Sequence, residues 1–260
     1  GLAAAIGTSA ARQLLELSTQ LKMSNEMLQR DIEKEQQLER ILKEFIATVS
    51  HELKTPLSIV RGYAEAVRDG FNPNKHQQYM DVILDETDNM EKLITNMLNL
   101  SELENGSVHL HWKIFDLNRI TEKVLNRFEA RSAEKNLMVE KPAAMPVMVH
   151  GDEAKIEICL LNLISNAIQQ SVVGGKIYVN YIYTDEEVEF SIENEGLPIQ
   201  EDDLEKIWQP FYRAEKSRSK EYGGTGLGLT ITQQILELHH TTCKVENTNR
   251  GVRFFFTLEK

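Results

Sequence analysis

The sequence has no long hydrophobic run, and its 29 basic residues are outnumbered by 40 acidic ones. No apolar stretch approaches the roughly 18 residues that a membrane-spanning helix needs. The N-terminal segment GLAAAIG is too short to span a bilayer and lacks the basic start of a secretory signal. We therefore expect any membrane anchor of the natural protein to lie in an N-terminal region outside this sequence. The formal net charge of −11 and the pI of about 5.2 argue against nucleic acid or an anionic membrane surface as the main partner.

Cysteine is scarce too. Cys159 and Cys243 are the only two in 260 residues, which indicates a reducing compartment rather than a disulfide-stabilised scaffold. We interpret both as small buried apolar residues. With 41% hydrophobic and 27% charged residues, the chain can bury a sizeable core, and its length allows about two domains.

Proline and glycine are nearly absent from the first part of the chain. Between residue 11 and a turn near residue 70, the only proline is Pro56 and the only glycine is Gly62, so this stretch is predicted to form one long helix. Leucines at positions 14, 21 and 28 repeat every seven residues, which indicates a coiled coil. The phase of this apolar repeat shifts near residues 32–38. Because a slip changes the winding of a coiled coil, we expect a signal from the N-terminal side to be transmitted there.

A second helix is predicted over about 75–103, after the turn cluster at 69–74. Each helix carries an apolar stripe: Leu42, Phe45, Val49, Leu53, Pro56, Val60, Tyr63 and Val67 on the first, and Tyr79, Ile83, Met90, Leu93, Met97 and Leu100 on the second. A single hairpin cannot cover both stripes, whereas two hairpins in a four-helix bundle can. We therefore predict a homodimer.

The pattern changes after Glu104. Helices are predicted over 118–135, 153–170 and about 226–240, and strands over 137–139, 177–183, 188–192, 243–248 and 252–258. Asp152 is predicted to be the N-cap of the middle helix. Helices mixed with mostly antiparallel strands are typical of a two-layer α/β sandwich. The predicted fold class is thus a helical hairpin that forms a dimeric four-helix bundle, followed by an α/β sandwich domain.

One histidine of the first helix is predicted to face away from the bundle core. His51 lies two residues from each of the core positions Val49 and Leu53, about 200° around the helix. Glu52 beside it can fix the tautomer of the imidazole and raise its basicity. Thr55 lies one turn further on the same face, and Pro56 removes the hydrogen bond to the Glu52 carbonyl. Taken without its neighbours, His51 could also be a surface histidine with no function, and this alternative stays open at this point.

The segment SHELKTPL, residues 50–57, resembles the H box of sensor histidine kinases. The resemblance implies that His51 is the phospho-acceptor and that Glu52 is the base that activates it. It also implies that Thr55 is the residue with which such kinases dephosphorylate their partner.

Three later segments resemble ATP-binding boxes of the same family, whose domain is shared with the Hsp90, gyrase and MutL ATPases. Asn162 and Asn166, at i and i+4, match the N box, and the resemblance implies that Asn166 holds Mg²⁺. WQPFYR, residues 208–213, matches the F box and implies that Arg213 contacts terminal phosphates. Lys216 adds positive charge beside Arg213. Alternatively, Lys216 is part of a run of charged residues that only faces solvent. GGTGLGL, residues 223–229, matches the G2 box. The resemblance implies that backbone amides of this segment bind the phosphates of the nucleotide, and the residues concerned are Gly224, Thr225, Gly226, Leu227 and Gly228.

One box departs from the family pattern Asp-x-Gly-x-Gly, in which the aspartate accepts a hydrogen bond from the adenine amino group. Here Asn194 replaces the aspartate and Pro198 the second glycine, while Gly196 is kept. An asparagine still accepts, but without a charge-assisted bond, and Gln169 and Gln170 stand where relatives often have a lysine and an aromatic residue. We predict weaker ATP binding than in typical relatives, not its loss. NEGLPI, residues 194–199, resembles the branch that governs glycopeptide or lantibiotic resistance in Gram-positive bacteria.

The resemblance covers about 40–260 and implies a dimeric sensor histidine kinase, the cytoplasmic portion of a membrane protein. It implies a dimerisation and histidine phosphotransfer hairpin over 44–104, a hinge linker over 105–114 and an ATP-binding domain over 115–260. Residues 1–43 resemble a coiled-coil signalling linker, with the end of a HAMP segment as an alternative. The γ-phosphoryl group of ATP would pass to His51 and then to an aspartate of a response-regulator receiver domain.

Two alternatives stay open: a non-catalytic module that signals by conformation, and an Hsp90-type ATPase. The intact pair of His51 and Glu52 argues against both.

Overall fold

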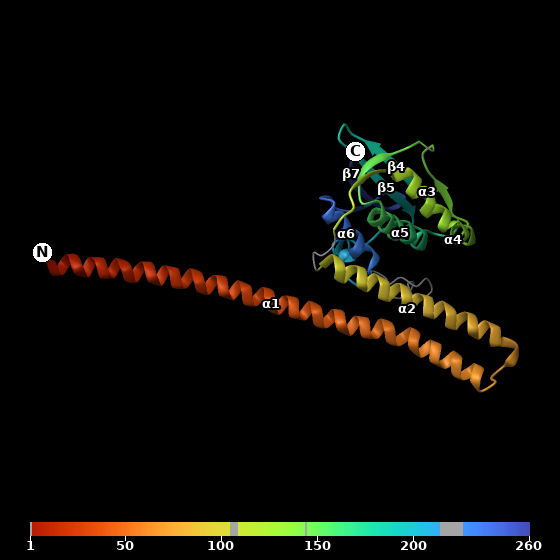
Figure 1. The fold of residues 1–260 in the computed structure, drawn as a ribbon, viewed down its shortest axis with the longest axis horizontal. Coiled ribbons are helices and arrows are strands. Elements are labelled where there is room, and N and C mark those ends of the chain that lie inside the picture. Colours follow the sequence, from red (N-terminus) through yellow and green to blue (C-terminus); the bar gives the residue numbers. More distant parts are fainter. Residues whose placement is uncertain (1, 105–108, 144, 214–225) are drawn as a thin grey trace. The chain divides into compact units, whose positions relative to one another are not determined.

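The computed structural model describes residues 2–104, 109–143, 145–213 and 226–260 (Figure 1). The chain divides into two compact units, one up to Lys54 and one from Thr55 onward. The boundary falls inside the first helix, α1, which runs over Leu2–Arg68 and continues through Pro56. Within the described residues, no helix combines the length and the hydropathy that crossing a membrane requires.

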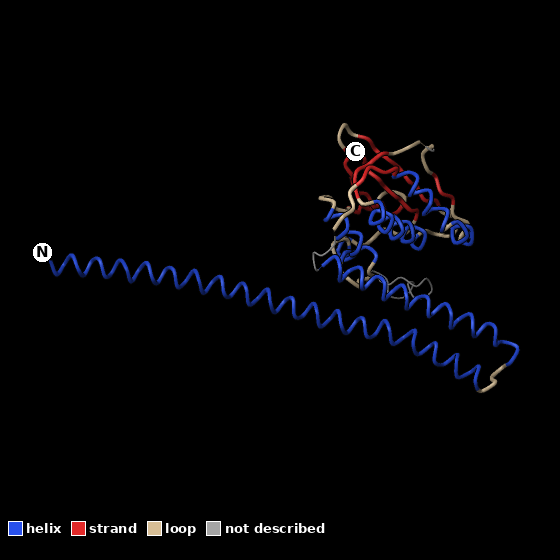
Figure 2. The backbone as a smooth tube through the Cα atoms, in the orientation of Figure 1, coloured by secondary structure: helices blue, strands red, loops and turns tan. Residues whose placement is uncertain are grey.

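The first unit is helical along its described length (Figure 2). Two leucines of the seven-residue repeat, Leu21 and Leu28, are 66% and 56% exposed. Exposed leucines spaced by one heptad form the surface on which a second helix packs in a coiled coil. The coiled coil itself stays a prediction.

The second unit begins with a helical hairpin. After α1 the chain turns through Gly70 and Asn72, both with positive φ, into a short 3₁₀ helix at Pro73–Lys75 and then into α2 at His76–Glu104. The rings of Tyr63 and Tyr79 lie 5.3 Å apart across the hairpin. Further apolar side chains of the hairpin stay exposed: Leu57, Met80, Leu84, Ile94 and Leu98. Leu93 and Leu100 of the predicted stripe on α2 are buried within the chain, whereas the exposed set needs another surface to cover it.

The rest of the second unit contains a five-stranded sheet of order β2-β4-β5-β7-β6. Its strands are β2 at Met138–Glu140, β4 at Lys176–Tyr183, β5 at Glu187–Glu195, β6 at Lys244–Asn247 and β7 at Gly251–Glu259. Only β2 runs parallel to its neighbour, and the other pairs are antiparallel. A separate two-stranded sheet joins β1 at Lys113–Asp116 to β3 at Met148–Gly151.

Helices cover one face of the five-stranded sheet (Figure 1). They are α3 at Leu117–Arg127, α4 at Glu129–Glu134, α5 at Glu153–Gln170 and α6 at Gly228–Leu238. The core lies between the layers, where Leu160 and Ile164 of α5 and Phe190 and Ile192 of β5 are almost fully buried. Because side chains alternate along a strand, Glu189 and Glu193 lie on the opposite face of the sheet. This is the two-layer α/β sandwich that the sequence predicts.

Two features differ from the sequence-based expectation. The helix predicted over 118–135 is broken at Phe128, whose φ of −102° and ψ of 7° end α3 before α4 begins. The strands β1 and β3 were not predicted, and β1 overlaps the end of the expected hinge at 105–114. Four-residue strands whose partners lie about 35 residues away are stabilised by pairing rather than by local sequence pattern.

Candidate functional site

His51 lies on the first unit with its side chain 79% exposed. Its Nδ1 atom lies 3.8 Å from Oε1 of Glu52, which is beyond hydrogen-bonding distance but close enough for a small rotation to close the gap. The exposure agrees with the helical phase that predicts an outward imidazole. Thr55 is exposed as well and belongs to the second unit.

The two N-box asparagines project from α5 and have different surroundings. The helix begins at the N-cap Asp152, whose Oδ1 accepts from the backbone N–H groups of Ala154 and Lys155. Nδ2 of Asn162 donates to the carbonyl oxygen of Gly228 at 2.9 Å and to Oγ1 of Thr232 at 3.3 Å. Asn162 therefore ties α5 to the first turn of α6, a positioning contact that the sequence did not reveal. Asn166 is half-buried one turn further on.

The F box meets the end of the glycine loop through the backbone. The Phe211 N–H donates to the Gly226 carbonyl at 2.9 Å. Gly226 has a φ of +69°, and a Cβ atom there would lie 2.7 Å from the Phe211 Cα. Only glycine fits this close approach in this conformation. Arg213, at the end of the same segment, is half-buried.

The start of α6 offers backbone donors. Its N-cap, Leu227, is fully buried and makes no side-chain cap hydrogen bond, and the first backbone N–H groups of an α-helix have no acceptor within the helix itself. The helix dipole favours an anion at this position. Three residues predicted to bind nucleotide, Lys216, Gly224 and Thr225, lie outside the described residues.

Asn194 lies near the end of β5 and is only 2% exposed. Its partners across the sheet are Ile177 of β4 and Val252 of β7, both aliphatic and buried. Its Nδ2 atom is buried and has no hydrogen-bond partner in the described part of the chain. A Cβ atom on Gly196 would lie 2.9 Å from this Nδ2 and 2.6 Å from the Gln170 carbonyl at the end of α5. The absence of a side chain at Gly196 therefore leaves space beside the amide.

Asp152 and His239 form a buried polar contact that the sequence reasoning missed. Asp152 Oδ2 accepts from the His111 N–H at 2.8 Å, and the Asp152 N–H donates to Nε2 of His239 at 3.0 Å. The Trp112 ring lies 5.1 Å from that of His239. Burial lowers the pKa of His239, although the carbonyl of Ile235 and the charge of Asp152 act in the other direction. The sequence pattern gives no signal for this contact, because the two residues lie 87 positions apart in the chain.

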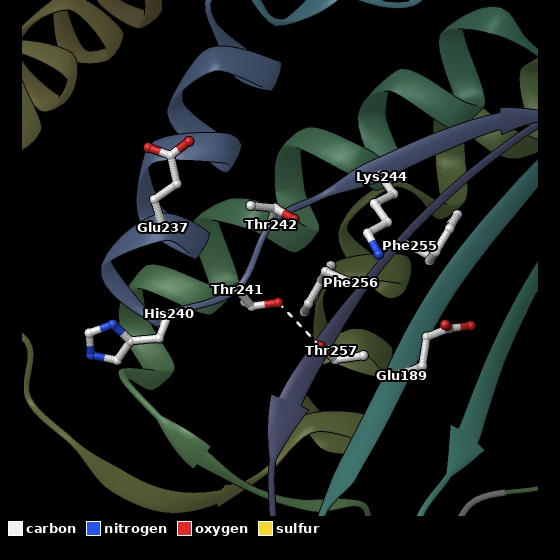
Figure 3. Close-up of a pocket in the computed structure, with 9 residues that line it drawn as sticks. All are labelled: Glu189, Glu237, His240, Thr241, Thr242, Lys244, Phe255, Phe256 and Thr257. Carbon is white, nitrogen blue, oxygen red and sulfur yellow. Dashed lines mark hydrogen bonds between the residues drawn. The ribbon is translucent and has the colours of Figure 1, made fainter.

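A pocket of about 460 Å³ lies elsewhere, on the side of β6 and β7 (Figure 3). His240, Thr241, Thr242 and Lys244 line it, and Thr241 and Thr257 hydrogen-bond to each other across 3.2 Å. None of the residues predicted to bind nucleotide contributes to this pocket. The chemistry assigned to the N, F and G2 boxes therefore does not belong to it.

Two family models match the chain. Residues 41–106 match the His Kinase A (phospho-acceptor) domain, and residues 151–260 match the histidine kinase-, DNA gyrase B- and HSP90-like ATPases. A solved structure, the catalytic domain of the histidine kinase ThkA, is 32% identical, with a TM-score of 0.52 over 58% of this chain and 98% of that one. The chain belongs to the sensor histidine kinases. The first match includes His51 and the second includes the N, F and G2 boxes.

The relatives of this histidine kinase include longer proteins. The sensor histidine kinase WalK of Bacillus subtilis is 30% identical over 88% of this chain and 38% of its own length. The sensor protein kinase WalK of Staphylococcus aureus is 32% identical over 88% of this chain and 56% of its own length. The chain thus spans less than two thirds of these relatives. The narrower resemblance to the resistance kinases stays a prediction.

Solved structures extend the likeness of this histidine kinase to the helical hairpin. The Acinetobacter baumannii histidine kinase AdeS is 29% identical, with a TM-score of 0.66 over 80% of this chain and 97% of that one. ThkA in complex with the response regulator protein TrrA is 28% identical, with a TM-score of 0.68 over 85% of this chain and 62% of that one. Both therefore support a fold made of a helical hairpin followed by an α/β sandwich.

Proposed function

We propose that this chain transfers the γ-phosphoryl group of ATP to His51 and then to an aspartate of a response regulator. The observation that carries the proposal is the exposed imidazole of His51, 3.8 Å from a carboxylate, inside the residues that match a phospho-acceptor domain. The ATPase-like domain of the same chain is the proposed source of the phosphoryl group. Domain boundaries at 1–43, 44–104, 105–114 and 115–260 form part of this proposal.

The position of Glu52 favours one ring nitrogen of His51 as the nucleophile. Glu52 Oε1 lies on the Nδ1 side of the ring. A hydrogen bond from Nδ1–H to this carboxylate would place the lone pair on Nε2. Nε2 would then attack the γ-phosphorus in line, so that an N–P bond forms while the bond from phosphorus to the β,γ-bridging oxygen breaks and ADP leaves. Glu52 would stabilise the positive charge that develops on the ring.

The nucleotide is proposed to lie between α5, the end of β5 and the start of α6. The backbone amides at the start of α6 and in the Gly226–Gly228 segment would bind phosphate oxygens, with Arg213 and Lys216 supplying positive charge. Gly224 and Thr225 are proposed to bind the nucleotide as well. Asn194 and Gly196 would meet the base. Asn162 contributes by holding α6 against α5.

Mg²⁺ is the ion that Asn166 is proposed to hold. When bound, it would offset the charge of the transferred phosphoryl group. An amide oxygen is a suitable neutral ligand, and in the described ranges no group of three or more acidic, histidine or cysteine side chains offers a complete site. Asn166 would therefore act together with the phosphates of the nucleotide. The linker at 105–114 must let the two domains approach each other for transfer.

The proposed partners follow from the hairpin and from the family. The exposed apolar side chains of the hairpin, which include Leu57, Leu84 and Leu98, support a homodimer built as a four-helix bundle. ThkA, which is similar in structure, is seen with a response regulator. A receiver domain is accordingly the proposed phosphoryl acceptor, with Thr55 assisting its dephosphorylation. The natural protein is proposed to be anchored in the cell membrane by an N-terminal region outside this sequence, with these residues in the cytoplasm.

The proposal is tested by incubating the protein with γ-labelled ATP and MgCl₂. We expect an acid-labile label on the wild type and on His240→Gln, a control at an exposed histidine, and none on His51→Gln. Turnover of ATP without any protein label would instead support an Hsp90-type ATPase. Absence of nucleotide binding would support a non-catalytic module.

A further inference from the structure

The side-chain amide of Asn194 is a buried donor that has no acceptor among the residues the structure describes. A buried polar atom that lacks a hydrogen bond costs about 1–3 kcal/mol, so folded proteins rarely leave one unless a ligand or water completes it. The two aliphatic cross-strand neighbours of Asn194, Ile177 and Val252, cannot pair with it. The amide is therefore a candidate contact for a bound molecule.

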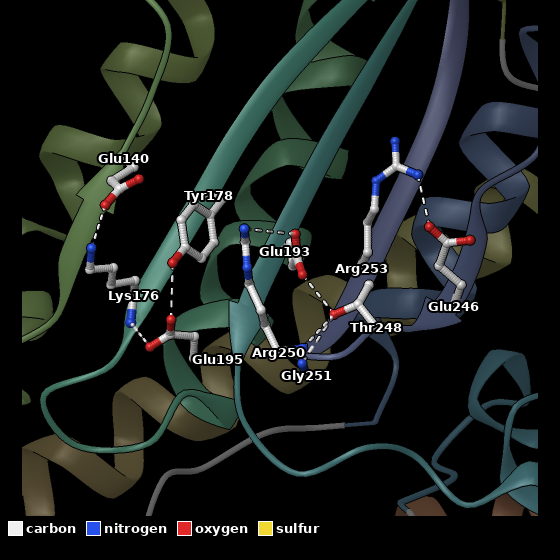
Figure 4. Close-up of polar contacts among 10 residues, drawn as sticks. All are labelled: Glu140, Lys176, Tyr178, Glu193, Glu195, Glu246, Thr248, Arg250, Gly251 and Arg253. Atoms are coloured by element: carbon white, nitrogen blue, oxygen red, sulfur yellow. Dashed lines mark hydrogen bonds and ion pairs between the residues drawn. The ribbon is translucent and has the colours of Figure 1, made fainter.

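Neighbouring carboxylates cannot take over this position. Glu193 and Glu195 lie on the opposite face of β5, since side chains alternate along a strand. Thr248 donates to Glu193 at 2.6 Å, and Glu195 accepts from the Tyr178 hydroxyl at 3.0 Å and from the Lys176 N–H at 2.9 Å (Figure 4). Both acidic side chains thus have partners away from Asn194. The group that meets the ligand here is a neutral amide.

A neutral amide and a carboxylate recognise purines differently. The six-position of adenine carries an amino donor next to the acceptor N1, whereas that of guanine carries a carbonyl acceptor next to the donor N1–H. A carboxylate offers only acceptors, so it pairs with the adenine amino group and repels the guanine carbonyl. An asparagine amide carries both an acceptor and a donor, and rotation about its last torsion exchanges them.

We propose that Asn194 lets the nucleotide site accept guanine as well as adenine nucleotides. Its oxygen would accept from the adenine amino group in one orientation, and its Nδ2 would donate to the guanine carbonyl in the other. Within the described ranges Nδ2 is a donor without a hydrogen-bond partner, and a donor is the group that the guanine carbonyl requires. Gly196 leaves space for the amide to turn, because its own Cβ would approach this nitrogen to 2.9 Å. This inference rests on the proposed function, in which Asn194 meets the base.

The test measures dissociation constants of ADP and GDP for the whole chain by calorimetry in MgCl₂. Diphosphates differ only in the base and cannot be turned over by the kinase. For the wild type we expect the two constants to lie within about tenfold of each other. In Asn194→Asp the preference for ADP over GDP should widen by about 10- to 100-fold, the size of one hydrogen bond to a charged group. Asn180→Asp, at an exposed position in the middle of β4, is the control and should keep the wild-type ratio.

A second variant guards against misfolding of Asn194→Asp. Asn194→Ala removes donor and acceptor together and should weaken ADP and GDP binding by similar factors. Wild-type discrimination of more than about 100-fold in favour of ADP would overturn the inference and leave the proposed function standing. A loss confined to ADP in Asn194→Ala would overturn it as well. Binding of neither diphosphate would overturn the proposed function and this inference together.

Discussion

The backbone N–H of Asp152 donates a 3.0 Å hydrogen bond to Nε2 of His239. Nδ1 of the same ring lies 2.8 Å from the Ile235 carbonyl, which can only accept. His239 is therefore neutral, with its proton on Nδ1. On its own, burial would raise the pKa of Asp152, but backbone donors from His111, Lys155 and Ala154 hold it below its ordinary value. Together, Asp152 and His239 link three places in the fold: the segment before β1, the start of α5 and the end of α6.

The buried His239 should make stability depend on pH. Because its pKa is lowered in the fold, mainly by burial, the unfolded chain binds the proton more readily than the folded chain. The contribution of neutral His239 to the free energy of unfolding should therefore be fully present above the ordinary histidine pKa of about 6.5. It should be lost as the pH falls from there through the lower pKa of the folded state. The free energy of unfolding, measured in urea between about pH 5 and 8, checks this.

Variants separate His239 from the charged groups that surround it. Asp152 favours its protonated form, while His150 and His240 oppose it. We expect His239→Gln to flatten the pH dependence, because glutamine does not titrate. His240→Gln changes an exposed neighbour and should keep most of the pH dependence of the free energy of unfolding. An unchanged slope in His239→Gln would assign the pH dependence to other groups.

The glycine loop should tolerate no side chain at Gly226. Gly226 and Gly174 have φ angles of +69° and +75°, so an alanine at either position should cost about 1–2 kcal/mol of stability. Only at Gly226 would the new Cβ also meet the backbone of Phe211 at 2.7 Å, whereas nothing lies within 4 Å at Gly174. Thermal unfolding and ATP titration should show a loss of nucleotide binding in Gly226→Ala and its retention in Gly174→Ala. Equal binding by both variants would contradict a role for this close approach.

The sequence could predict what depends on local pattern. The phase of the helix predicted an outward His51, and the position of Asp152 before an apolar helix predicted its N-cap, because both depend on residues within a few positions. The link from Asn162 to Gly228 joins residues 66 positions apart. The contact of Asp152 with His239 spans 87 positions. Contacts of this kind depend on how the elements pack, which no periodicity encodes.

The two N-box asparagines should respond differently to substitution. Asn162→Asp removes the donor to the Gly228 carbonyl and places a negative charge against it, so we expect a loss of about 1–3 kcal/mol in the free energy of unfolding. Asn166→Asp should leave stability close to the wild type but reduce phosphorylation of His51. Urea denaturation and γ-labelling measure the two effects separately. A stable Asn162→Asp would show that this hydrogen bond does not hold α6.

Glu52 should accelerate phosphoryl transfer without affecting ATP binding. Glu52→Gln keeps the shape of the side chain but removes the charge that would orient the imidazole and stabilise it during attack. We expect phosphorylation of His51 to slow by about 100-fold or more. Glu39→Gln, which changes an exposed carboxylate paired with Lys43 on the same helix, is the control and should label normally. Equal rates in the two variants would remove Glu52 from the proposed chemistry.

Thr55 should act on the phosphorylated partner and not on His51. Thr55→Ala removes one exposed hydroxyl, so labelling of His51 by ATP should stay within about twofold of the wild type. Dephosphorylation of a receiver domain that this kinase has phosphorylated should slow by about tenfold or more, as expected for loss of a group that positions water. Thr87→Ala, an exposed threonine that bonds its own helix on α2, should change neither rate. A parallel fall of both rates in Thr55→Ala would mean that the substitution disturbs the helix around His51, because a hydroxyl needed only for hydrolysis cannot slow the forward transfer.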